Sequence, residues 1–89
     1  MTLEELTAKY IQNSETALEE IRVIRDVKQV NRKEVDSVIG TARRYLEDAK
    51  YYRGRGKLET GLASAAYCEG LLDALRLLGV VKFSWPEER

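Results

Sequence analysis

Two acidic residues within the most apolar stretch are the first candidates for chemistry. Glu69 and Asp73 stand four positions apart, so in a helix both carboxylates project from one face. Asp48 belongs to the preceding segment, and an antiparallel arrangement of the two segments would bring it near the pair. Mg²⁺ takes oxygen ligands and is commonly held by carboxylates. One hypothesis is therefore a Mg²⁺-dependent hydrolase that uses these three residues.

A structural role for the same carboxylates is the alternative, and we favour it. A metal site between two helices needs paired carboxylates on both, but the preceding segment offers only the adjacent Glu47 and Asp48, which diverge by roughly 100°. Structural ion pairs also outnumber functional sites. We therefore expect Glu69 or Asp73 to bond a tyrosine hydroxyl or to pair with an arginine, the candidates being Arg43, Arg44 and Arg76. We predict no catalytic residue, no bound metal and no cofactor.

Three basic residues, Arg53, Arg55 and Lys57, alternate with glycines and could contact phosphate. The glycines do not match a P-loop, which needs Gly-x-x-x-x-Gly-Lys-Ser/Thr after a strand. No exposed aromatic platform for stacking on bases is evident either. We expect a solvated helix end here and no nucleic acid as partner. RNA or nucleotide contact through the 53–57 turn is the alternative function.

The other reactive side chains favour packing over catalysis. The sequence has no histidine, which removes the usual general base and the commonest transition-metal ligand. Cys68 is the single cysteine, so no intramolecular disulfide can form, which fits a reducing, cytoplasmic setting. We expect Cys68 to be a small core residue. Tyr45, Tyr52 and Tyr67 are expected at the core boundary, with the ring inside and the hydroxyl bonded or wet.

The stretch 62–79 must position these residues, because it is the most apolar run in the chain. It indicates one helix that is hydrophobic on most of its circumference and that other elements must cover. Ala66, Gly70 and Ala74 recur every four residues and form a stripe of small side chains. Small side chains let helices approach closely, so we predict a close helix crossing at this stripe. Gly79 is a suitable helix stop.

Two further helices precede this one. Thr2 and Glu5 have the spacing of a capping box, and Asn31 with Glu34 repeats the signal. Apolar residues then recur at helical spacing in both segments. We predict a single all-α domain over residues 1–89. It is a three-helix antiparallel bundle with helices at about 3–28, 32–53 and 57–78 and a short C-terminal apolar tail. Phe83 and Trp85 are expected to fold back on the bundle, and no strand pair is expected.

Charge and hydropathy exclude several classes of protein. The 15 basic and 15 acidic residues give a formal net charge of zero, so nothing global favours nucleic acid. No uncharged apolar run of 18 residues indicates a membrane span. The N-terminal stretch lacks the basic start and apolar centre of a signal peptide. We therefore expect a cytoplasmic protein without a membrane partner.

The second half also carries a recognisable pattern. It reads Tyr45-Leu46-Glu47-Asp48-Ala49-Lys50-Tyr51-Tyr52, then Gly56, then Tyr67-Cys68-Glu69-Gly70-Leu71-Leu72-Asp73-Ala74. From about residue 35 to residue 80 the chain resembles the archaeal domain-of-unknown-function family 357. It departs from the family pattern at Cys68, where a small alanine is expected, and in the basic 53–57 turn. The resemblance implies a small helical bundle of archaeal, cytoplasmic origin with no established activity.

The leading functional hypothesis is therefore an uncharacterised small helical protein without enzymatic activity. We expect it to be a module for protein interaction or self-association. A second copy of the chain, forming a homodimer, or another protein would be its partner. The apolar surface of the 62–79 helix supports this hypothesis, since two covering helices leave part of it open.

Overall fold

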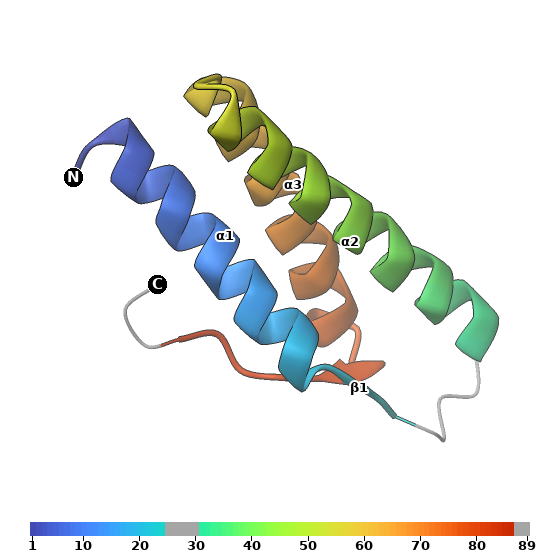
Figure 1. Ribbon diagram of the computed structural model, residues 1–89. Helices are drawn as coiled ribbons and strands as arrows, with labels where there is room; N and C mark the ends of the chain where they lie inside the picture. Colours follow the sequence, from blue (N-terminus) through green and yellow to red (C-terminus); the bar gives the residue numbers. More distant parts are fainter. Residues whose placement is uncertain (25–30, 87–89) are drawn as a thin grey trace.

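The computed structural model describes residues 1–24 and 31–86, which form three packed helices and a small two-stranded sheet (Figure 1). The helices are α1 (Leu3–Glu20), α2 (Arg32–Gly54) and α3 (Leu58–Leu77). Strand β1 (Arg22–Val23) follows α1, and strand β2 (Val81–Lys82) follows α3. Helices α1 and α3 run in the same direction, and α2 runs opposite to both (Figure 1). The predicted all-α three-helix bundle is confirmed.

Both predicted N-terminal caps form. The backbone amide of Glu5 donates to Thr2 Oγ1 at 3.1 Å, and the amide of Thr2 donates to Glu5 Oε1 at 2.9 Å. This capping box satisfies two donors that a helix start leaves open. The bonds from Thr2 also lower the pKa of the Glu5 carboxyl. At the start of α2 the amide of Glu34 donates to Asn31 Oδ1 at 2.9 Å.

Helices α2 and α3 end in the same way, each at a glycine. Gly56 has φ +75° and Gly79 has φ +76°, a left-handed conformation that glycine adopts without steric cost. After Gly56 the amide of Lys57 donates to the carbonyl of Tyr52. After Gly79 the amide of Val80 donates to the carbonyl of Leu75. These are Schellman closures, and the first of them folds α2 and α3 into an antiparallel hairpin.

The core lies between α3 and its two neighbours. Helix α3 packs on both α2 and α1, whereas α1 and α2 share few contacts. The buried apolar side chains come from all three helices and from the tail: Ile11, Ala17, Leu18, Val35, Ile39, Ala42, Leu46, Ala49, Ala65, Cys68, Leu72, Leu75, Val80, Val81 and Phe83. Thr7, Asn13 and Ser14 of α1 and Glu69 of α3 are buried with them. The α1–α3 interface therefore contains a polar component within an apolar core.

The closest approach of helix backbones found at a glycine lies at Gly61. A Cβ added there would stand 3.2 Å from the carbonyl oxygen of Ala49, 3.4 Å from the amide nitrogen of Arg53 and 3.6 Å from Thr7 Cγ2. A Cβ would be tighter than ordinary contact with the backbone of α2, so a side chain larger than a methyl group would press on α2 and on the side of α1. The contact lies at the N-terminal end of α3, where all three helices meet.

The predicted close crossing at Ala66, Gly70 and Ala74 is wrong within this chain. All three residues are exposed, and a Cβ on Gly70 would meet no atom within 4 Å. The helix is rotated so that Gly61, Ala65, Cys68 and Leu72 face inward instead. The small residues lie on its outward side because α1 and α2 both pack against the opposite one.

The first helix is shorter than predicted and leads into a strand. It ends at Glu20, and residues 21–24 are extended; residues 25–28 of the predicted helix lie outside the described residues. Strand β1 pairs antiparallel with β2, with Arg22 opposite Lys82 and Val23 opposite Val81. The expectation of no strand pair is therefore wrong. Helices α2 and α3 match their predicted ranges to within a residue or so.

The apolar tail folds back as predicted. Val80, Val81 and Phe83 are buried, and Trp85 is half-buried against the core. The rings of Phe83 and Trp85 meet edge to face with centroids 4.9 Å apart. In Figure 1 the tail crosses the bundle level with the last turn of α1, at the end opposite to the α2–α3 turn. Among the described residues, no helix is long and apolar enough to cross a membrane.

Candidate functional site

The three carboxylates of the metal hypothesis do not form one site. Among the described residues no three acidic or cysteine side chains come together in a group that could hold a metal ion. Asp48 is exposed on α2, whereas Glu69 is buried in α3. Asp73 Oδ1 accepts hydrogen bonds from Arg76 Nε at 3.0 Å and from Trp85 Nε1 at 2.8 Å. Asp73 therefore anchors the tail, and one of its predicted arginine partners is found.

The basic turn is partly neutralised. Arg53 binds Glu4 across the bundle, with Nε and Nη2 each 2.7 Å from Oε1. The guanidinium of Arg55 lies 5.6 Å from the ring centroid of Tyr51 and donates to its hydroxyl at 3.3 Å. Lys57 is exposed. Of the three predicted phosphate contacts, only Arg55 and Lys57 therefore have no described ion pair.

Tyr51 was missed by the sequence reasoning, which saw no exposed aromatic near this turn. Its side chain is 57% exposed, and its ring meets that of Tyr52 edge to face with centroids 5.3 Å apart. Its exposed position follows from the helical phase of α2, since it lies outside the buried stripe that contains Ala42, Leu46 and Ala49. The run of two adjacent tyrosines was the available signal, because adjacent helical residues cannot both face the core.

Cys68 is the small core residue that was predicted. It is fully buried, and burial raises the pKa of its thiol to about 11. The nearby Ser14 hydroxyl lowers that pKa and the charge of Glu69 raises it, but both effects are smaller than desolvation. At neutral pH the thiol is protonated and unreactive.

A cross-helix ion pair holds α1 against α2. Lys50 Nζ lies 2.8 Å from Glu15 Oε2 on α1 and 3.3 Å from Glu47 Oε2 on its own helix. The hydrogen bond to Glu15 is the main reason that the pKa of Lys50 is raised. These side chains line a hollow of about 380 Å³ between α1 and α2. Glu15, Glu47 and Lys50 are thus paired with one another at one part of this hollow, whose lining also includes Glu19 and Arg43.

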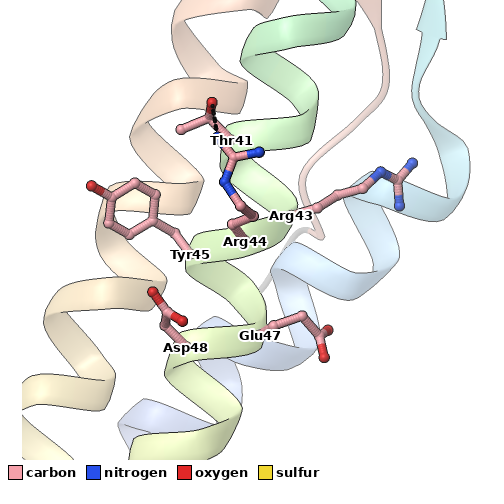
Figure 2. A pocket seen from close by; sticks show the side chains of 6 residues that line it. All are labelled: Thr41, Arg43, Arg44, Tyr45, Glu47 and Asp48. Atoms are coloured by element: carbon pink, nitrogen blue, oxygen red, sulfur yellow. Dashed lines mark hydrogen bonds between the residues drawn. The ribbon is translucent and has the colours of Figure 1, made fainter.

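A second hollow, of about 480 Å³, lies along the outer side of α2 (Figure 2). Figure 2 shows that its lining residues point in two directions: Tyr45 and Asp48 toward α3, and Arg43 and Glu47 toward α1. The guanidinium of Arg44 folds back to Thr41, with Nη2 3.0 Å from Oγ1. These residues diverge around one helix, so they do not converge on a common point as an active site requires.

A tyrosine pair joins this side of α2 to α3. The rings of Tyr45 and Tyr67 are stacked, with centroids 4.4 Å apart and planes 25° apart. Tyr45 is half-buried, as expected for a boundary position, but Tyr67 is 55% exposed. The two rings cover the outer side of the α2–α3 interface. Residues that flank this tyrosine pair on the two helices therefore lie on one surface.

The outward side of α3 next to this tyrosine pair is apolar and exposed. We call it the α3 face, and it consists of Ala63, Ala66, Tyr67, Gly70, Ala74 and Leu77, all of them exposed. Leu77 is 72% exposed and the adjoining Leu78 is 70% exposed. Between Ala63 and Leu77 the charged residues of α3 are the buried Glu69 and the paired, partly exposed Asp73 and Arg76. The exposed sides of α1 and α2 are by contrast rich in Glu, Lys and Arg.

One of three comparisons with known proteins gives a match. The comparison with curated proteins gives no match, and neither does the comparison with solved structures. A family model, described as a protein of unknown function (DUF357), matches residues 9–81. That match covers most of the chain, including all of α2 and α3. The chain therefore belongs to the DUF357 family.

Proposed function

We propose that this protein is a non-enzymatic interaction module that binds a protein through the α3 face. The observation that carries the proposal is the contrast between that face and the rest of the surface. The six exposed residues of the α3 face carry no charge, and the exposed Leu78 adjoins them. The bundle as a whole has 30 charged side chains, so such a face stands out. Contiguous apolar surface of this kind commonly marks an interface.

The contacts that the reactive and charged side chains make support the same proposal. Asp73 bonds the tail, Cys68 is buried and protonated, and Arg53 is paired with Glu4. These contacts give each group a structural role in the bundle. The small residues Ala66, Gly70 and Ala74 keep the α3 face flat, so that a partner helix can approach its backbone closely.

The compartment and origin are part of the proposal. We place the protein in the cytoplasm because its single thiol is free and buried, a form that a reducing compartment preserves. Its archaeal origin rests on the family resemblance.

Photocrosslinking tests the proposed function. A photoreactive phenylalanine analogue is placed at Ala74 on the α3 face, and a matched control carries it at Glu19, which is exposed on α1. The protein is irradiated in extract of its own organism, and adducts are identified by mass spectrometry. We expect a defined protein adduct at Ala74 that is absent at Glu19.

A second variant links the adduct to the face. Gly70→Glu adds a charge where nothing lies within 4 Å, so the fold should be retained, which circular dichroism checks. The Ala74 adduct should then be lost. If no adduct forms at Ala74, or the same adducts form at Glu19, the proposed function is wrong.

A further inference from the structure

We infer that α1, together with the strand β1 that follows it, opens from the α2–α3 hairpin as one unit while the hairpin stays folded. Such an opening is independent of the α3 face and of the protein partner proposed above. Three observations carry it: the composition of the surface that α1 buries, the exposed ion pairs between α1 and α2, and the contacts that α2 and α3 make without α1.

The surface that α1 buries is partly polar and has few large apolar groups. Its large apolar side chains in the core are Ile11 and Leu18. Thr7, Asn13 and Ser14 are buried beside them, and burying a hydroxyl or an amide is less favourable than burying a hydrocarbon group. A segment with few buried apolar contacts opens at a lower free energy than the molecule as a whole.

Surface ion pairs join α1 to α2. Glu4 pairs with Arg53 and Glu15 pairs with Lys50, and the four side chains are 37–47% exposed. Ion pairs as exposed as these contribute little to stability. The hollow of about 380 Å³ lies between the same two helices. Helix α1 is therefore held weakly on the side that faces α2.

The α2–α3 hairpin has contacts of its own at its turn and along its length. Near the turn, the backbone of α3 at Gly61 approaches the carbonyl oxygen of Ala49 on α2. Further along, the rings of Tyr45 and Tyr67 stack with centroids 4.4 Å apart. The turn itself is closed through Gly56, which has φ +75°. These contacts join α2 to α3 directly, so they are kept when α1 leaves.

Cys68 lies where it can report the opening. Its side chain is fully buried on the inward side of α3, and Ser14 of α1 lies close enough for its hydroxyl to lower the pKa of the thiol. Departure of α1 uncovers this side of α3 and gives a thiol reagent access to it. Because Cys68 is the single cysteine of the chain, labelling reports on this one position.

Thiol labelling of the full chain under native conditions tests the inference. The reagent is an aromatic disulfide that releases a coloured thiolate, and the labelling rate is measured at urea concentrations well below the unfolding midpoint. Urea unfolding followed by circular dichroism, with the labelling rate of the unfolded chain, gives the rate expected if Cys68 reacts only after global unfolding. We expect labelling about tenfold or more faster than that rate. Its urea dependence should be shallower, because the opening of α1 exposes only part of the surface that unfolding exposes.

Two mild substitutions distinguish the opening of α1 from unfolding of the hairpin. Ile11→Val removes a buried methyl group from α1, so the labelling rate and the unfolding equilibrium constant should both rise by about two- to tenfold. Ala66→Gly is the matched control at an exposed position of α3. Its lower helix propensity should raise the unfolding constant by about fivefold. It should leave the labelling rate within about twofold of the unaltered chain, because α3 is helical in both the closed and the open state.

Each contrary outcome identifies a different error. A labelling rate equal to that calculated from global unfolding, with the same urea dependence, shows that α1 does not open separately. If Ala66→Gly accelerates labelling as much as it raises the unfolding constant, Cys68 is uncovered only when the hairpin unfolds, and the inference is wrong. Rapid labelling that Ile11→Val leaves unchanged shows that the reagent reaches the thiol without the departure of α1, which also overturns it.

Discussion

The indole nitrogen of Trp85 donates a 2.8 Å hydrogen bond to Oδ1 of Asp73, and this bond fixes the C-terminal tail to α3. The same oxygen accepts from Arg76 at 3.0 Å, so two donors hold the carboxylate in place. Because the acceptor is charged, the bond is stronger than one between neutral groups. The acidic residue that looked like a metal ligand is thus part of the tail's anchor.

Trp85→Phe should lower the free energy of unfolding by about 1–2 kcal/mol, because the aromatic contact with Phe83 is largely kept while the bond to Asp73 is lost. Urea unfolding followed by circular dichroism measures the change. Ser84→Ala, at an exposed position beside it, should be nearly neutral. Equal stability of Trp85→Phe and the unaltered chain would show that the bond contributes nothing.

Gly61→Val should be strongly destabilising, by about 2–3 kcal/mol or more, since its side chain would enter the backbone of α2 at Ala49 and Arg53. The control is Gly40→Ala in the middle of α2, where a Cβ would meet only the end of Arg44 at 4.0 Å. That substitution should raise stability by up to about 1 kcal/mol through helix propensity. Thermal melts of both variants check the pair; a rise in melting temperature for Gly61→Val would refute the close approach.

Cys68 should make stability depend on alkaline pH. Its pKa is about 11 in the folded protein and near 9 in an unfolded chain. The protonated thiol is favoured on folding, so its contribution is complete below pH 9 and is lost as pH rises from about 9 to 11. Across that window the free energy of unfolding should fall by up to roughly 1 kcal/mol per pH unit more than in Cys68→Ala. Parallel slopes for the two proteins would contradict the raised pKa.

The basic turn should bind RNA no more tightly than non-specific contact does, with dissociation constants of roughly 10⁻⁴–10⁻⁶ M at physiological salt. Arg53 is already paired with Glu4, and only Arg55 and Lys57 remain for phosphate. Fluorescence anisotropy over a salt series measures the affinity. Submicromolar, salt-sensitive binding that is lost in both Arg55→Ala and Tyr51→Ala would instead support nucleic-acid contact through the exposed tyrosine.

The three helices, their starts and the ends of α2 and α3 could be predicted from local signals, whereas the end of α1 could not. Thr2 with Glu5, Asn31 with Glu34, and Gly79 each act within one helical turn, so the sequence alone determines what they do. The apolar periodicity of α2 also determines its rotation, because its opposite side is charged and only one rotation buries Val35, Ala42 and Ala49.

The rotation of α3 could not be predicted in the same way. It is apolar on most sides, so its pattern does not distinguish the face with Gly61 and Leu72 from the face with Gly70 and Ala74. The choice is made by long-range packing, in which the carbonyl of Ala49 and the methyl group of Thr7 lie against Gly61. The strand pair was missed for a related reason, since Arg22 and Val23 acquire their partners only when the tail returns to them.

The positions of these contacts along the chain have a consequence for the order of folding. Helices α2 and α3 are joined by a three-residue turn, whereas Thr7 lies 51 residues from Leu58, whose carbonyl it contacts. Closing the longer loop costs more conformational entropy, so we expect the hairpin to be formed in the folding transition state and α1 to dock after it. Strand β1 directly follows α1 in the sequence, and it pairs with β2 at the end of the hairpin opposite to the α2–α3 turn. The docking of α1, the last step of folding, is therefore also the step in which the tail gains its strand partner. Substitutions in the tail should speed unfolding and leave the folding rate almost unchanged.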